Sequence, residues 1–158
     1  MSLESVRTFL AQHAPDVPLI VGAASLATVE QAAAGLAVTP PQIAKTMALD
    51  LNGRTIVLVL GGVARIDNRK FRDRFGAKPR LIGLDQVEQI TGHPVGGVCP
   101  LGLAQPLPVF CDQSLREHAE VLPAGGAPDA AIRIAPERLA LLAGAEWVDV
   151  ARRSLPPP

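Results

Sequence analysis

The chain has 158 residues, of which 48% are hydrophobic and 19% are charged. This length fits one domain, and the hydrophobic content excludes a largely disordered chain. The formal net charge is zero, so overall charge gives no sign of a nucleic-acid partner.

Hydrophobic spacing and turn residues predict the secondary structure of nearly the whole chain. In chain order the expected elements are a helix over 2–13, a strand over 17–21, a helix over 28–36, strands over 44–51 and 55–60, a helix over 67–75, a strand over 81–82, a helix over 85–90, strands over 109–111, 120–122 and 130–134, a helix over 136–143 and a strand over 146–151. Residues 155–158, Leu and three prolines, are expected to be a frayed tail.

Local signals support several of these boundaries. Thr28, followed three residues later by Gln31, is a capping box. Asn52-Gly53 between two hydrophobic runs predicts a tight hairpin. We expect Asp67 to cap the basic helix and Asp85 to cap the next helix. The mixed order of strands and short helices favours a single α+β domain over 1–154, with a mixed, mostly antiparallel sheet that curls around a pocket.

Features associated with other classes of protein are missing from the sequence. The N-terminal residues are too polar for a signal peptide, and no hydrophobic run approaches the roughly 18 residues of a membrane helix. Cys99 and Cys111 form no disulfide or metal pattern, and the three histidines have no ligand spacing. We expect a soluble cytoplasmic protein with free thiols, no metal, no cofactor and no membrane partner.

Lys45 is the first candidate site residue, because it is the only charge between Val38 and Leu49. In a strand it shares a face with Met47 and Leu49. A lysine on a hydrophobic face extends its ammonium to solvent, pairs with an acid or serves chemistry. The first of these explanations, a lysine at a strand end, stays open beside a role in a site.

The segment over 91–108 is the second candidate, because a long loop inside a compact domain is often functional. Its glycines, with prolines that stiffen it, expose backbone N–H groups that can bind a carbonyl or a developing oxyanion. His93 and Cys99 also allow a base-and-nucleophile hypothesis. The alternative is that Cys99 is a small hydrophobic filler.

A cluster of basic residues is the third candidate. Residues 65–80 hold seven of the fifteen Lys and Arg side chains, against Asp67 and Asp73. From this cluster we take Arg69, Lys70 and Arg72 as candidate contacts to a tRNA backbone. A solvated helix face is an equally good explanation.

Three segments together resemble one family. They are 43–46 (Ile-Ala-Lys-Thr), 96–102 (Gly-Gly-Val-Cys-Pro-Leu-Gly) and 124–126 (Ala-Gly-Gly) with 129–136 after it. In this order they are similar to the YbaK/ProX family of aminoacyl-tRNA editing domains, which resemble the editing domain inserted in bacterial prolyl-tRNA synthetase.

The resemblance implies trans-editing: hydrolysis of the ester between tRNA and a wrong small amino acid such as Ala, Cys, Ser or Thr. Lys45 matches the family lysine, which is thought to contact the region of the 3′-terminal adenosine. The catalytic set implied is Lys45, Gly96, Gly97 and Pro100, with backbone N–H groups of the loop at the ester carbonyl. The implied substrate-binding residues are Ile43, Met47, Val98, Cys99, Leu101, Gly125 and Asp129.

Several points stay open at this stage. Asp129 could bind the α-ammonium of the substrate or satisfy local backbone donors. The expected partner is aminoacyl-tRNA, delivered directly or by a synthetase or elongation factor. Two other functions remain: a non-catalytic module that binds tRNA or adenosine with the same fold, and a hydrolase that uses the Cys99 thiol.

Overall fold

The computed structural model describes residues 2–22 and 24–152. Its elements in chain order are α1 (Ser2–His13), β1 (Leu19–Val21), α2 (Val29–Leu36), η1 (Pro40–Gln42), β2 (Ile43–Leu51), β3 (Arg54–Gly61), β4 (Arg65–Ile66), α3 (Asn68–Phe75), α4 (Leu84–Thr91), β5 (Val109–Asp112), η2 (Gln113–Glu117), β6 (Leu122–Pro123), β7 (Ala130–Ile132), α5 (Pro136–Ala143), β8 (Glu146–Val148) and β9 (Ala151–Arg152). The predicted tail over 155–158 lies outside the described residues.

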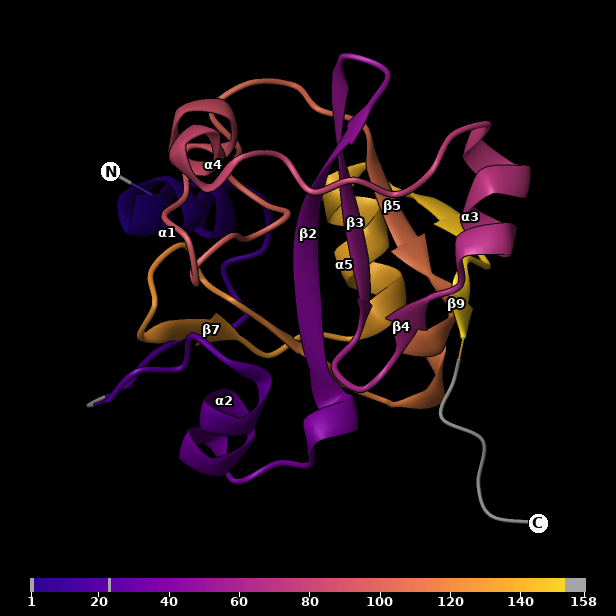
Figure 1. Cartoon of the computed structure of the whole chain (residues 1–158). Coiled ribbons are helices and arrows are strands. Elements are labelled where there is room, and N and C mark those ends of the chain that lie inside the picture. The colour runs from indigo at the N-terminus through magenta and orange to yellow at the C-terminus, as the bar shows by residue number, and fades with distance from the viewer. Residues whose placement is uncertain (1, 23, 153–158) are drawn as a thin grey trace, which may run out of the picture.

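A five-stranded sheet in the order β6-β2-β3-β5-β8 forms the centre of the molecule (Figure 1). β2 and β3 are the predicted antiparallel hairpin, with Asn52 and Gly53 at positive φ in its turn. β6, β5 and β8 pair in parallel with their neighbours. The α+β class and the mixed sheet are therefore confirmed, but antiparallel pairing belongs to the hairpin and the two small sheets, β1-β7 and β4-β9.

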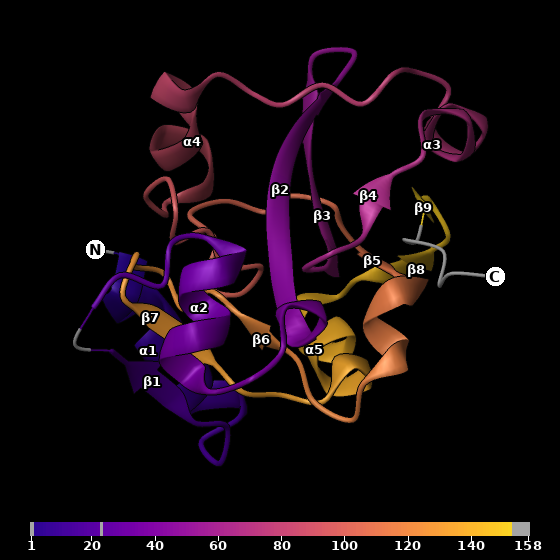
Figure 2. The same cartoon turned by 60° about the horizontal axis from the view of Figure 1, so that its bottom comes forward.

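The two faces of the sheet carry separate hydrophobic clusters. Val57 and Val59 of β3 point into a core with α1 and α5, whereas Leu58 and Leu60 point into a core with Phe71 of α3. Because successive strand residues point to opposite faces, a strand buried on both sides reads as the unbroken hydrophobic run seen in β3. Figure 1 shows α5 behind the hairpin, and both ribbon views show α3 to one side of it, with α2 and β7 on the other side (Figures 1 and 2).

The outer edge of β2, away from β3, is paired only in two places. β6 pairs with it at Ile43 and Ala44. Farther along, Asp50 donates its N–H to Arg80, and the carbonyl of Ala48 accepts from Ile82. Thr46 lies two residues before Ala48, so its backbone N–H and C=O also face this edge. The edge beside Thr46 is therefore free of a neighbouring strand among the residues the structure describes.

Several predicted boundaries need correction. β1 begins at Leu19 and not at residue 17, and β7 ends at Ile132 and not at residue 134. Gly83, not Asp85, is the N-cap of α4, and Asp85 lies in the first turn, where its charge favours the helix dipole. The predicted strand over 81–82 is a single bridge from Leu81 to Leu49. The strand expected over 120–122 lies at 122–123. The strand expected over 146–151 is divided into β8 and β9.

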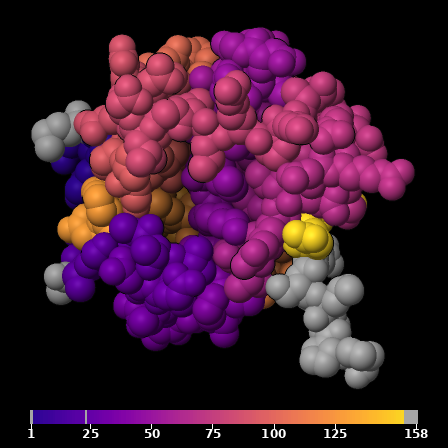
Figure 3. Space-filling view, in the orientation of Figure 1, coloured from indigo at the N-terminus to yellow at the C-terminus, as the bar shows by residue number. Residues whose placement is uncertain are grey.

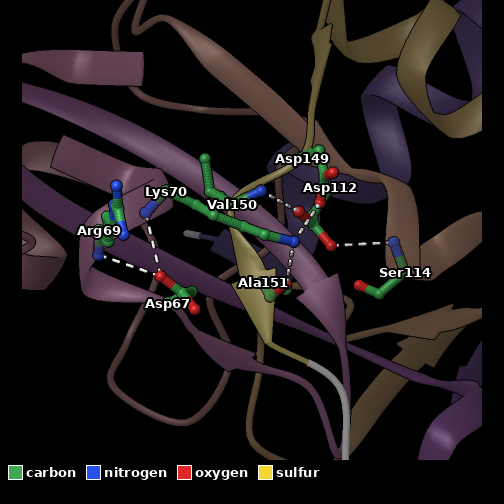
Figure 4. Close-up of polar contacts among 8 residues, drawn as sticks. All are labelled: Asp67, Arg69, Lys70, Asp112, Ser114, Asp149, Val150 and Ala151. Carbon is green, nitrogen blue, oxygen red and sulfur yellow. Dashed lines mark hydrogen bonds and ion pairs between the residues drawn. The ribbon is translucent and has the colours of Figure 1, made fainter. Parts of the chain in front are cut away.

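Polar contacts around Asp112 explain the division of this last strand (Figure 4). The buried Asp112 carboxylate accepts from the N–H groups of Ser114 and Val150, at 2.9 and 2.8 Å. On the other side, the Lys70 ammonium lies 3.2 Å from Asp149 and donates to the carbonyl of Ala151 at 3.3 Å. These contacts turn the chain after β8, so that β9 leaves the central sheet and pairs with β4.

Candidate functional site

A cavity of about 230 Å³ lies beside the open edge of β2. Four parts of the chain enclose it: the N-terminal end of α2, the beginning of β2, the loop after α4, and β6 with β7. Figure 3 shows the hollow between the violet residues of α2, strand β2 and the rose-coloured loop. Its lining consists of residues 26–29, Ala32, residues 43–46, Gly96, Val98, Leu122, Ala124, Ala130 and Ala131.

Lys45 is the only charged residue in this lining. Its side chain is half-buried, and burial lowers the pKa of its ammonium below the ordinary value. The nearby Arg65 guanidinium lowers this pKa further, whereas Glu30 of α2 opposes the shift. A negatively charged ligand would offset both the lost hydration of this ammonium and its repulsion by Arg65. The charge of the site therefore suits an anion.

Lys45 and Thr46 leave opposite faces of β2 because they are consecutive strand residues. Both border the cavity because it lies at the edge of the strand, where the two faces meet. Thr46 Oγ1 is enclosed and has no hydrogen-bond partner among the described residues. Thr46 was missed from the sequence, since an unpaired hydroxyl becomes visible only once its surroundings are known.

The loop between Gly92 and Gly102 approaches the cavity through a tight turn. The Gly97 N–H donates to the Pro94 carbonyl at 2.9 Å, and Gly96 at the third position of the turn has a φ of 85°. Such a φ favours glycine. A side chain on Gly97 would place its Cβ 2.6 Å from the backbone of Ala127. The glycines therefore let the loop pack closely against the segment before β7.

The turn determines which N–H groups of the loop are already hydrogen-bonded and which are free. The N–H of Gly97 is already used inside the turn. Those of Gly96 and Val98, the two loop residues that line the cavity, have no acceptor among the described residues. They are the donors available to a ligand carbonyl. The sequence indicated this loop, but which N–H groups are free depends on its turn.

The structure brings together Ile43, Lys45, Gly96 and Val98 from the predicted site. The other predicted residues lie outside the cavity lining, for different reasons. Cys99 and Leu101 are buried in the core against α1 and α5, Pro100 faces a separate groove next to Phe9, and Met47 packs toward α3. Gly125 packs against Leu19, and the half-buried Asp129 accepts from the Gly22 N–H through its backbone carbonyl.

Cys99 is poorly suited to be a nucleophile. Its side chain is fully buried, and burial raises the pKa of the thiol to about 12. A reactive cysteine needs a lowered pKa and access to substrate. The Nε2 atom of His93 is occupied by the Leu101 carbonyl at 3.0 Å. The structure therefore favours the filler explanation for Cys99.

The three predicted tRNA contacts differ in their surroundings. Arg69 and Arg72 are exposed on α3. Lys70, by contrast, joins α3 to β9 through Asp149 and Ala151 (Figure 4). Both ribbon views place α3 on the far side of the β2–β3 hairpin from α2 and β7 (Figures 1 and 2). An RNA touching both α3 and the cavity would have to cross the hairpin.

Metal clusters and membrane-spanning helices are considered for the described residues only. No cluster of three or more His, Cys, Asp or Glu side chains is placed there to hold a metal ion. No helix in that part of the chain has the length and hydrophobicity needed to cross a bilayer.

Comparison with known sequences connects the chain to tRNA editing. Residues 23–142 match the sequence profile of the aminoacyl-tRNA editing domain. The protein YwhH of Bacillus subtilis, described as uncharacterized, is 39% identical over 96% of this chain and 98% of its own. The proline–tRNA ligase of Solidesulfovibrio magneticus is 36% identical over 56% of this chain, which corresponds to only 15% of that enzyme.

A solved structure gives the same result at the level of the fold. The crystal structure of a candidate trans-editing enzyme for prolyl tRNA synthetase superimposes with a TM-score of 0.87 and 29% identity. The match covers 96% of this chain and 97% of the other. The similarity thus extends over the whole domain, including every element around the cavity.

Proposed function

Because the chain belongs to the aminoacyl-tRNA editing domain family, we propose that it is a trans-editing deacylase that hydrolyses the ester between tRNA and a wrong, small amino acid. One observation carries this proposal: the lining of one small cavity brings together Lys45 and two loop residues, Gly96 and Val98, whose backbone N–H groups have no acceptor among the described residues.

The proposed roles follow from the charge of each group. The Lys45 ammonium holds the negatively charged 3′-terminal nucleotide at the mouth of the cavity. The N–H groups of Gly96 and Val98 donate to the ester carbonyl and stabilise the oxyanion that forms on it. Removal of one such donor typically costs roughly a hundred- to a thousandfold in rate.

Water supplies the attacking oxygen in this proposal. Its oxygen bonds to the ester carbonyl carbon, the bond to the ribose oxygen breaks, and the ribose oxygen takes up a proton. The products are free tRNA and the amino acid. The ester is already activated, and the buried Cys99 thiol is unsuited to attack, so no covalent intermediate is needed.

The cavity supports a small amino acid as the group removed. Its volume of about 230 Å³ is below the roughly 300–1,000 Å³ of pockets for drug-sized ligands. Alanine, valine, leucine and isoleucine side chains supply most of its lining. Ala, Cys, Ser and Thr esters are the proposed substrates, and a tRNA substrate implies action in the cytoplasm. A synthetase or an elongation factor could deliver the tRNA.

Deacylation of a panel of Ala-, Cys-, Ser- and Thr-tRNA tests the proposal. We expect the wild type to accelerate the loss of at least one ester. The same tRNAs without enzyme give the background rate. Binding of aminoacyl-tRNA without faster hydrolysis of any ester would instead favour a non-catalytic module of the same fold.

A further inference from the structure

His93 lies inside the loop that carries Gly96 and Val98, and its side chain has no exposed surface. Its ring Nε2 is 3.0 Å from the carbonyl oxygen of Leu101, on the opposite side of the loop. A second bond, from the Ala104 N–H to the Thr91 carbonyl at 2.9 Å, joins the ends of the same segment. These two contacts close the base of the loop, and the segment over 94–100 is held between them.

The contacts of His93 also fix its orientation and its tautomer. Its backbone N–H donates to Thr91 Oγ1 at 3.1 Å, and that hydroxyl donates to the Val87 carbonyl of α4 at 2.6 Å. A carbonyl oxygen only accepts, so Nε2 must carry the proton. Nδ1 is then an enclosed lone pair with no partner among the described residues. The backbone of His93 is therefore anchored to α4, and its ring is bonded to the far side of the loop.

We propose that His93 is a positioning residue for the deacylation, which bonds Leu101 and so holds the N–H groups of Gly96 and Val98 at the cavity. This inference rests on the proposed function, because the ester carbonyl is what those N–H groups would bind. His93 itself is not in the cavity lining and does not touch the substrate. Its effect on rate arises because catalytic donors must be held within about 0.5 Å of their productive position.

Two substitutions separate this role from simple filling of the core. His93→Gln keeps an N–H donor at nearly the reach of Nε2, whereas His93→Leu fills the space without a donor. We expect His93→Leu to lower kcat about 10- to 100-fold with KM changed less than about twofold, because small misplacements of reacting groups cost up to about 10²-fold. His93→Gln should retain kcat within about threefold.

Amide hydrogen exchange provides a readout that does not depend on turnover. In His93→Leu, the amides over 95–99, above all the hydrogen-bonded amide of Gly97, should exchange faster than in the wild type, while those of β3 remain unchanged; His93→Gln should keep the wild-type pattern. His118→Leu is the matched control, since this half-buried histidine also has an unpartnered ring nitrogen but lies outside the cavity and its loop. It should change neither the loop amides nor kcat.

The outcomes distinguish the inference from the proposed function. Wild-type exchange over 95–99 in His93→Leu would overturn the positioning role, as would wild-type kcat in that variant. A wild-type protein that hydrolyses none of the four esters would overturn the proposed function, and with it the catalytic part of this inference. Both measurements are made on the full chain, well below the thermal midpoint of each variant.

Discussion

Lys45 of β2 and Gly96 of the loop after α4 border the same cavity, although they come from segments far apart in the sequence. Each supplies something the other lacks: the lysine has a charge with a flexible stem, and the glycine has a backbone donor in a fixed turn. The sheet and the loop must therefore both be intact for the site to exist, and the predictions below test them separately.

Replacing Lys45 by Met should abolish editing while slightly stabilising the free protein. Burial and Arg65 lower the pKa of Lys45, so the unfolded chain binds this proton more tightly and the charge disfavours folding at neutral pH. Because the side chain is half-exposed, we expect a gain of roughly 0.5 kcal/mol or less. Deacylation rates and thermal melts at pH 7.5 test this. A variant with wild-type turnover would remove Lys45 from the site.

Gly97→Ala should damage the loop by crowding. The added Cβ would lie 2.6 Å from the Ala127 backbone, and overpacking of this kind typically costs about 1–3 kcal/mol. Moving the loop should also lower kcat. Gly61→Ala is the control, because Gly61 like Gly97 has no positive φ, and its added Cβ would meet only ordinary contacts, the nearest at 3.5 Å. Urea melts and deacylation rates of both variants test this prediction. A kcat of Gly97→Ala equal to that of the wild type would contradict it.

Reversing two charges on α3 should weaken tRNA binding. Arg69→Glu with Arg72→Glu changes two exposed residues of α3, so we expect weaker binding at low salt and a smaller dependence of affinity on salt. Lys70→Gln is a useful contrast, since Lys70 contacts Asp149 and Ala151. That pair is exposed and should contribute only about 0–1 kcal/mol. Filter binding across a salt series measures the effect; unchanged affinity in the double variant would make α3 an ordinary solvated face.

Cys99→Ala should keep most of the activity and lose some stability. The thiol is fully buried with a pKa raised to about 12, so alkylating reagents should react slowly with the native protein. Loss of the sulfur leaves a small cavity, which we expect to cost on the order of 1 kcal/mol. Single-turnover deacylation and thermal melts of the variant test both statements. Inactivation by selective alkylation, together with an inactive Cys99→Ala protein, would restore the thiol hypothesis.

Stability should decline in mild acid partly through His93. Burial lowers the pKa of this histidine below its ordinary value of 6.5. As the pH falls below about 6.5, the unfolded chain binds a proton that the folded chain does not, so folding is disfavoured, by at most about 1.4 kcal/mol for each pH unit. Above that pH there is no loss. Urea melts between pH 5 and 8 should show a shallower decline for His93→Gln, and identical slopes would contradict the assignment.

The sequence predicted the elements better than their pairing. The Asn52-Gly53 turn and the Thr28 and Asp67 caps act locally, and the structure has each of them where expected. Parallel pairing of β5 and β6 depends on segments far apart in the chain, and no local pattern contains that information. Asp85 shows the same limit, because an acid near a helix start fits either the cap or the first turn.

For the site, family resemblance indicated residues 43–46 and 96–102, and parts of both segments line one cavity in the structure. In the Gly96–Pro100 loop, neighbouring residues have different surroundings. Val98 reaches the cavity, whereas Cys99 is buried. Residues 26–29 line the site because α2 packs beside β2. Their sequence predicted a helix start but gave no indication of that position.

The interrupted edge of β2 also bears on how the protein behaves at high concentration. An exposed strand edge is a template on which another molecule can add a strand and begin to aggregate. Here β6 covers one end of the edge and residues 80–82 cover the other. The opening at Thr46 is too short to pair with a strand of another copy. The same arrangement that leaves the backbone of Thr46 without a neighbouring strand thus limits strand addition along the edge of β2.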